Sequence, residues 1–195
     1  MASNNKSFKY GGLFLFIGIA QFFIFLNIAA FVDKGYSISN NTISHLGIDS
    51  TPYIFDISII VLGIFEVLSG IFLKKYSMGV TVSLILSGIG AAGVGIFNEH
   101  FGDIHLIFAL FAFVFASIAS FFVFFKKKDG MAIIWAILGA FGLVALILFT
   151  LTIEVSKYYD LGLGVGGIER LILIPNIIWA LAFGGSLYYS VKTEK

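Results

Sequence analysis

Six long apolar runs constrain this chain more than any other feature of its sequence. They cover residues 11–32, 52–73, 79–97, 104–125, 131–153 and 167–191. A helix rises about 1.5 Å per residue, so about 20 mostly apolar residues are needed to cross the hydrocarbon core of a bilayer. Each run reaches or closely approaches that length. The sequence therefore predicts an all-α integral membrane bundle of six transmembrane helices.

The composition agrees with a membrane protein and excludes several other classes. The chain is 59% hydrophobic and 12% charged, whereas soluble domains are about 45–50% apolar and about 25% charged. One transmembrane domain, residues 11–191, is expected between the short segments 1–10 and 192–195. The net charge of +1 offers no basic surface for nucleic acid, so the expected partners are membrane lipids. Cysteine is absent, which excludes disulfides and thiolate metal ligands.

The placement of the basic residues predicts how the bundle is oriented. Cytoplasmic loops of membrane proteins retain Lys and Arg. Three basic residues fall on one side of the predicted bundle, namely Lys34, Lys157 and Arg170. The other nine fall on the opposite side: Lys6, Lys9, Lys74, Lys75, Lys126, Lys127, Lys128, Lys192 and Lys195. We therefore expect a multi-pass protein of the cell membrane with both termini in the cytoplasm.

Most of the other polar chemistry collects on the side with few lysines. Ionisable groups in or near a membrane are costly and often mark function. The leading hypothesis is thus an outer-face polar pocket that binds lipid headgroups or ions. Its candidate residues are Ser44, His45, Asp56, Glu99, His100, Asp103, His105, Glu169 and Arg170.

A divalent metal is one alternative use of these residues. Imidazole and carboxylate are ligands that zinc and similar metals accept when thiolates are missing. The candidate ligands are His45, His100, Asp103 and His105, which would make the protein a metal-dependent membrane lipid hydrolase or transferase. The other interpretation is that these are solvated loop residues, with Asp103 capping the fourth helix.

Arg170 lies inside the sixth apolar run, on the side where positive charge is normally avoided. A guanidinium stays charged, so it must reach the interface or find a partner. Either a structural ion pair or an anionic ligand such as a lipid phosphate satisfies it. The carboxylates expected at a similar depth are Asp56, Glu99, Asp103 and Glu154.

Glu66 falls inside the second apolar run, where a carboxylate is costly. Ser87 and Ser117 are expected at a similar depth, so a structural hydrogen bond is one interpretation. The other is a proton relay in a small proton-coupled transporter.

Small residues repeat at four-residue spacing in the third and fourth runs. Such residues let helix backbones approach closely in lipid. We expect these two helices to pack as a hairpin through Gly88, Ala92, Ala112, Ala116 and Ser120.

Three stretches resemble a known family of membrane proteins. They are Ser39-Asn40-Asn41-Thr42-Ile43-Ser44-His45-Leu46-Gly47, then Gly95-Ile96-Phe97 with His105, and Gly167-Ile168-Glu169-Arg170-Leu171-Ile172-Leu173-Ile174-Pro175 with Trp179. The chain resembles the prokaryotic multi-pass family catalogued as domain of unknown function 998. The resemblance implies a six-helix bundle, points to Ser44, His105 and Arg170, and implies no activity. His45 stands where the family often has aspartate.

Overall fold

The computed structural model describes residues 2–193, and this part of the chain contains helices but no strand. Six long helices match the six apolar runs and are long and apolar enough to cross a membrane, so the predicted fold class is confirmed. They are α1 (Ala2–Val32), α2 (Pro52–Phe72), α3 (Met78–Ile96), α4 (Asp103–Lys127), α5 (Gly130–Glu154) and α6 (Gly164–Thr193). Of the predicted segment 192–195, residues 194 and 195 lie outside the described residues.

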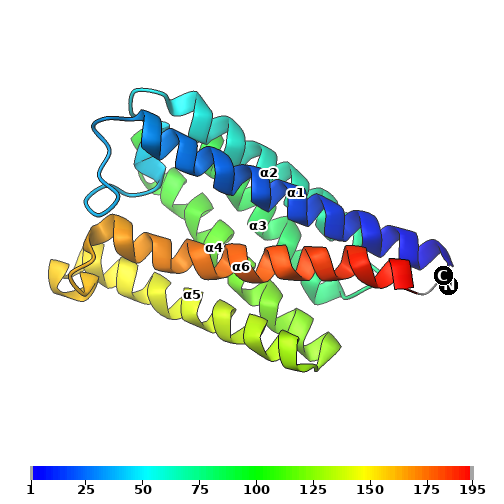
Figure 1. The fold of residues 1–195 in the computed structure, drawn as a ribbon. Coiled ribbons are helices and arrows are strands. Elements are labelled where there is room, and N and C mark those ends of the chain that lie inside the picture. The colour runs from blue at the N-terminus through cyan, green and yellow to red at the C-terminus, as the bar shows by residue number, and fades with distance from the viewer. Residues whose placement is uncertain (1, 194–195) are drawn as a thin grey trace.

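Three short 3₁₀ helices lie in the connections at one end of the bundle: η1 (Ser44–Gly47), η2 (Glu99–Phe101) and η3 (Lys157–Asp160). We call this end, formed by loops 33–51, 97–102 and 155–163, the histidine end. The opposite end, with loops 73–77 and 128–129, is the lysine end. Helix α1 starts and helix α6 stops at the lysine end (Figure 1).

Local capping interactions explain where several helices begin. The Ser77 hydroxyl accepts a hydrogen bond from the Val80 amide before α3, and the Asp129 carboxylate does the same for the Ala132 amide before α5. Pro52 occupies the first turn of α2, where its missing N–H costs nothing. The predicted cap at Asp103 is wrong: Gly102 is the N-cap of α4, and no side chain caps it.

The six helices form a ring in chain order. Each helix packs against the next, and α6 returns to pack against α1 (Figure 1). Short connections favour this arrangement because they make consecutive helices antiparallel neighbours. Helix α4 also touches α6 across the ring, so α5 packs on the outside of the α4–α6 pair.

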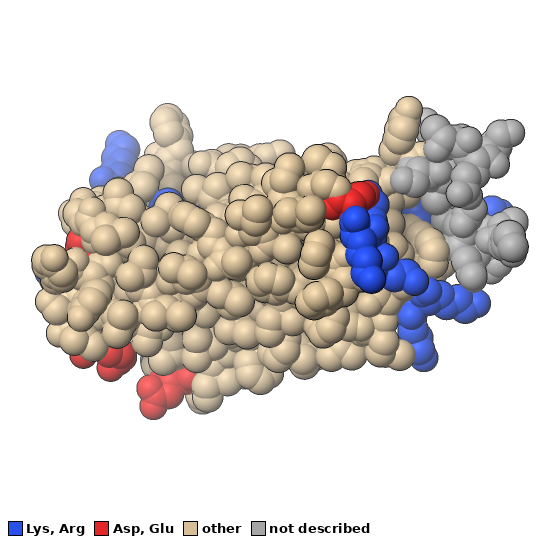
Figure 2. All heavy atoms as spheres, turned by 90° about the horizontal axis from the view of Figure 1, so that it is seen from below, with Lys and Arg blue, Asp and Glu red and all other residues tan. Residues whose placement is uncertain are grey.

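The flanks of the bundle form an apolar belt. Figure 2 shows a wide zone without charged side chains between two ends that carry them. Large apolar side chains are exposed along this zone, including Phe31 at 90% and Ile137 at 61%. In water such a surface would aggregate, whereas hydrocarbon solvates it. The chain is therefore a multi-pass membrane protein.

Helices α3 and α4 do pack together, as expected from their small residues. The predicted Ala112 makes the contact on α4, but on α3 the contact is made by Gly90 and not by Gly88 or Ala92. Gly90 provides the close approach to α4, because a Cβ there would lie 2.3 Å from the Ala112 amide nitrogen. Gly88 and Ala92 face α2 instead, where a Cβ on Gly63 would lie 2.4 Å from the Gly88 carbonyl oxygen. The small residues of α3 thus serve two neighbouring helices.

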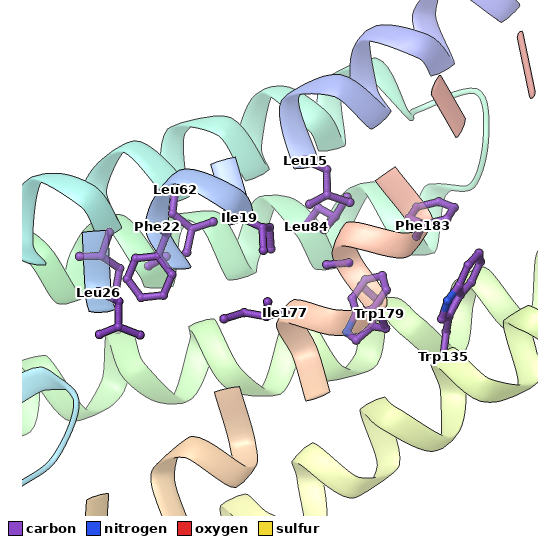
Figure 3. Close-up of a cluster of buried hydrophobic side chains, with 14 of the residues drawn as sticks. Leu15, Ile19, Phe22, Leu26, Leu62, Leu84, Trp135, Ile177, Trp179 and Phe183 are labelled. Carbon is purple, nitrogen blue, oxygen red and sulfur yellow. The ribbon is translucent and has the colours of Figure 1, made fainter. Parts of the chain in front are cut away.

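The half of the bundle nearer the lysine end has a dense aromatic core. Trp135, Trp179 and Phe183 are at most 2% exposed and contact one another through Phe183 (Figure 3). Leu73 and Val80, both fully buried, complete this layer at the α2–α3 connection. Packing here leaves little room, so the cavities of the molecule lie closer to the histidine end.

Candidate functional site

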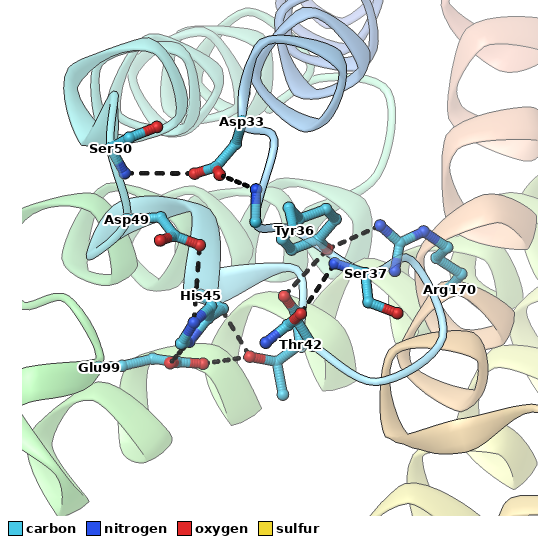
Figure 4. A network of polar contacts seen from close by, with 11 residues as sticks. Asp33, Tyr36, Ser37, Thr42, His45, Asp49, Ser50, Glu99 and Arg170 are labelled. Carbon is cyan, nitrogen blue, oxygen red and sulfur yellow. Dashed lines mark hydrogen bonds and ion pairs between the residues drawn. The ribbon is translucent and has the colours of Figure 1, made fainter.

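Loop 33–51 folds back over the histidine end and is held by Asp33 at its start. The Asp33 carboxylate accepts hydrogen bonds from the amides of Gly35, at 2.9 Å, and Ser50, at 3.2 Å (Figure 4). Burial raises the pKa of Asp33, but these hydrogen bonds outweigh it and leave the pKa below the ordinary 3.8. The two ends of the loop are therefore joined by an ionised carboxylate.

Glu99 connects this loop to the start of η2. Its carboxylate accepts a hydrogen bond from the Thr42 hydroxyl and lies 3.3 Å from His45 Nδ1. His45 Nε2 lies 3.6 Å from the Asp49 carboxylate, so the ring lies between two acidic groups (Figure 4). His45 is thus a structural partner of Glu99 and not a free ligand.

Arg170 fastens the same loop to α6 through hydrogen bonds. Its guanidinium donates to the carbonyls of Ile38, at 3.0 Å, and Gly166, at 2.9 Å, and to the Tyr36 hydroxyl at 2.8 Å. Burial raises the pKa of Tyr36, so the phenol stays neutral and can accept. Within the described residues no carboxylate forms an ion pair with Arg170, and two carbonyls and a phenol accept three of its N–H groups. The anionic ligand stays a prediction.

The start of α6 allows the loop to approach closely. The Gly166 amide donates to the Ser39 carbonyl at 2.9 Å, and a Cβ on Gly166 would lie 2.1 Å from the Asn41 carbonyl oxygen. Glu169, 3% exposed, accepts a hydrogen bond from the Ile43 amide. The Gly-Gly-Ile-Glu-Arg stretch at positions 166–170 is therefore a docking surface for loop 33–51.

The remaining histidines lie apart from this network. His105, 8% exposed, makes a 2.7 Å hydrogen bond through Nδ1 to the Phe97 carbonyl, which joins the first turn of α4 to the end of α3. His100 and Asp103 are exposed. Among the described residues, no three His, Asp or Glu side chains come together as metal ligands. The structure thus does not assemble the predicted metal shell, and the metal-dependent hydrolase or transferase loses its geometric basis.

Asp56 lies under loop 33–51, just after the first turn of α2. One of its carboxylate oxygens is buried without a hydrogen-bond partner among the described residues. A Cβ on Gly47 would lie 2.5 Å from that oxygen, so Asp56 packs against the backbone of η1. It is separate from the pockets described next.

A lateral pocket of about 210 Å³ opens between α4 and α5 near the histidine end. Its walls are apolar and come from the two helices: Leu106, Ala109, Leu110, Phe113, Leu146, Phe149 and Ile153. Its polar end is formed by Thr42, Ser44, Glu99, His105, Thr150, Glu154 and Glu169. Four of the nine predicted pocket residues line it: Ser44, Glu99, His105 and Glu169.

A second, central cavity of about 70 Å³ lies inside the ring and shares Ser44, Ala109, Phe113 and Glu169 with the lateral pocket. It extends along α2 to Glu66, which is 5% exposed. Helices α1, α2, α3, α4 and α6 contribute to its lining, whereas α5 does not.

Sequence reasoning missed the polar group around Asn176 on α6. Asn176 Oδ1 accepts from Trp179 Nε1 at 2.9 Å, and its Nδ2 donates to Ser117 Oγ at 3.0 Å. Ser117 therefore pairs with Asn176 and not with Glu66. The Ser87 hydroxyl donates to the Ala112 carbonyl at 3.1 Å and also lies close enough to Glu66 to interact with its carboxyl group, as one of the two predicted serines. The signal was available, because an asparagine inside an apolar run requires a partner in lipid.

The fold and the two adjoining cavities define a six-helix integral membrane protein with a largely apolar site near one end of its bundle, where polar side chains of the loops and helix ends border it. The model of the family described as protein of unknown function (DUF998) matches residues 16–186. The chain therefore belongs to this family, as its short motifs suggested. No curated protein and no solved structure matches the chain.

Proposed function

We propose that the protein binds an amphiphilic membrane lipid in the lateral pocket. The observation that carries the proposal is a pocket with apolar walls on two helices and a polar end at the loops. Apolar pockets with a few convergent polar groups are the usual form of a small-molecule site. The acyl chain lies against α4 and α5, and the headgroup meets the polar end.

The pocket faces the bilayer and not only the loops. Leu106 on α4 is 45% exposed and Ile153 on α5 is 53% exposed, and both line the pocket. A lipid can therefore enter sideways from the membrane without passing through water. The apolar walls of α4 and α5 then hold the acyl chain of the lipid mainly by van der Waals packing, because lipid tails and apolar side chains are equally hydrophobic.

The polar end favours headgroups that donate hydrogen bonds. Glu99, Glu154 and Glu169 supply carboxylates there, and no Lys or Arg is found among the described residues that line the pocket. A hydroxyl or ammonium headgroup finds acceptors, whereas a phosphate would meet like charge. Arg170 is not among the described residues that line the pocket, so lipid phosphate binding at this residue is not part of the proposal.

Lipid binding is tested by filling the pocket. Ala109→Phe places an aromatic ring in the lateral pocket. Ala140→Phe is the control, because it makes the same change on α5 at an exposed position outside the pocket. Native mass spectrometry of the purified proteins should show a co-purified lipid with the wild type and Ala140→Phe, and at least tenfold less with Ala109→Phe. Equal lipid occupancy in both variants would remove the proposal, provided that both elute as monodisperse proteins.

We further propose that the histidine end faces the outside of the cell and both termini face the cytoplasm. The support is the nine-to-three distribution of basic residues together with the positive-inside rule. The chain has no cysteine, so Lys157→Cys and Lys75→Cys provide single thiols at the two ends. A membrane-impermeant maleimide added to intact cells should label Lys157→Cys alone; labelling of Lys75→Cys alone would reverse the orientation.

A further inference from the structure

Glu66 is a buried carboxyl group that the lipid pocket does not use. It is 5% exposed, and its Oε2 has no hydrogen-bond partner among the described residues. Gly63 and Gly88 bring the backbones of α2 and α3 together beside it, since a Cβ on Gly88 would lie 2.5 Å from the Gly63 carbonyl oxygen and 3.0 Å from the Glu66 Cβ. The Ser87 hydroxyl beside the carboxyl group carries no charge. An ionised carboxylate without a positive partner is costly at such a position, so the group must be neutral or must meet a positive charge.

The central cavity connects Glu66 with the histidine end. At about 1.5 Å per residue, Glu66 lies about 21 Å along α2 from the histidine end, and Glu169 lies about 8 Å along α6 from the same end. Ser87 and Asn176 also line the cavity. Its volume of about 70 Å³ is enough for several waters, since one water needs about 10–15 Å³.

The cavity is closed toward the lysine end. Leu73, Val80 and Phe183 are fully buried there, and Trp135 packs edge-on against Phe183 (Figure 3). None of these side chains lines the cavity among the described residues. Access to Glu66 is therefore one-sided.

We propose that Glu66 is a proton-binding site reached from the histidine end through the central cavity. Water in the cavity delivers H⁺ to the carboxylate, which becomes the neutral acid, and removes it again when the pH at that end rises. The other titratable side chain lining the cavity is Glu169 from α6; the described lining residues of α1, α3 and α4 carry none. The proposal does not depend on lipid binding in the lateral pocket.

The water path is tested with two matched serines on α3. Ser83 and Ser87 are both 2% exposed, but Ser87 lines the cavity and Ser83, one turn closer to the lysine end, does not. The reagent must reach the histidine end alone. We therefore use whichever preparation, intact cells or inverted vesicles, lets an impermeant reagent label Lys157→Cys and not Lys75→Cys. Under these conditions 2-aminoethyl methanethiosulfonate should modify Ser87→Cys at least tenfold faster than Ser83→Cys. Equal rates would overturn the one-sided path.

Proton binding is tested directly on the wild-type protein. Dicyclohexylcarbodiimide reacts with protonated carboxyls in apolar surroundings, and peptide mass spectrometry locates the adduct. We expect an adduct at Glu66 that decreases at least fivefold between pH 6 and pH 10, with Glu66→Gln as the unreactive control. The proposal would be overturned if Glu66 were not labelled or if its labelling did not change with pH. Suppression of the labelling by 200 mM Na⁺ would also overturn it, because Glu66 would then bind a metal cation.

Discussion

The docking of loop 33–51 onto α6 depends on the missing side chain of Gly166, and this dependence can be calculated. In Gly166→Ala the new Cβ would lie 2.1 Å from the Asn41 carbonyl oxygen and 2.4 Å from the Ile38 carbonyl oxygen. Both contacts are with backbone, so the loop must move away by about 1 Å to restore ordinary van der Waals distances.

That movement breaks two hydrogen bonds. The Gly166 amide loses its hydrogen bond to the Ser39 carbonyl, which is 2.9 Å long in the wild type. Arg170 loses its hydrogen bond to the Ile38 carbonyl, which is 3.0 Å long in the wild type. A neutral hydrogen bond contributes about 0.5–1.5 kcal/mol and one to a charged group about 1.5–3 kcal/mol. We therefore expect local opening of the loop to become easier by about 2–4.5 kcal/mol, or about 30- to 1,600-fold at about 1.4 kcal/mol per tenfold.

Amide hydrogen exchange of residues 36–47 measures this opening directly. The control is Gly130→Ala, because a Cβ there has nothing within 4 Å, and its exchange should match the wild type. If the loop of Gly166→Ala exchanged within threefold of the wild type, the docking surface would not hold the loop and the reasoning would be refuted.

Three further predictions concern other parts of the molecule. Gly63→Val should destabilise the α2–α3 contact by about 1–3 kcal/mol, because a Cβ would lie 2.4 Å from the Gly88 carbonyl oxygen; an unchanged melting temperature in detergent would contradict this. Asn176→Ala should cost about 1–3 kcal/mol by leaving Trp179 Nε1 unpaired, and unfolding in denaturing detergent measures this loss of stability. The pKa of Asp33 is lowered, so its stabilisation is complete above pH 3.8 and is lost as the pH falls through the folded-state pKa. Asp33→Asn should therefore lose less thermal stability than the wild type between pH 5 and pH 3, and equal losses would exclude this role.

The predicted helices differ from the observed ones mainly at the ends of the chain. The apolar run began at residue 11, whereas α1 begins at Ala2, and α6 likewise extends beyond its apolar run in both directions. Hydropathy marks where a helix meets hydrocarbon, but a helix continues into water as long as its backbone hydrogen bonds persist. The interior boundaries of α1 to α5 agree within two residues because caps such as Ser77 and Asp129 lie close to the ends of the apolar runs, whereas α6 begins three residues before its run.

The sequence predicted which residues lie at the end of the bundle that holds the candidate site, but not how their side chains are arranged there. Grouping Glu99, His105 and Glu169 at one end followed from the alternation of six crossings. Which of these would meet a cavity did not follow, because partners are set by loop conformation. Arg170 shows the difficulty: its acceptors are two carbonyls and a phenol, and no sequence pattern distinguishes them from a carboxylate.

The sequence by itself determined that the chain crosses a membrane six times, which family it resembles, and at which end its histidines lie. Each of these depends on the length, order or identity of residues along the chain. Only the tertiary structure decided which helix faces point inward, that Gly88 serves α2 and not α4, and that a pocket opens between α4 and α5. The physical reason is that lipid tails are as apolar as a protein core. Hydrophobicity therefore does not distinguish the buried faces of these helices from the exposed ones. Side-chain packing decides which faces are buried.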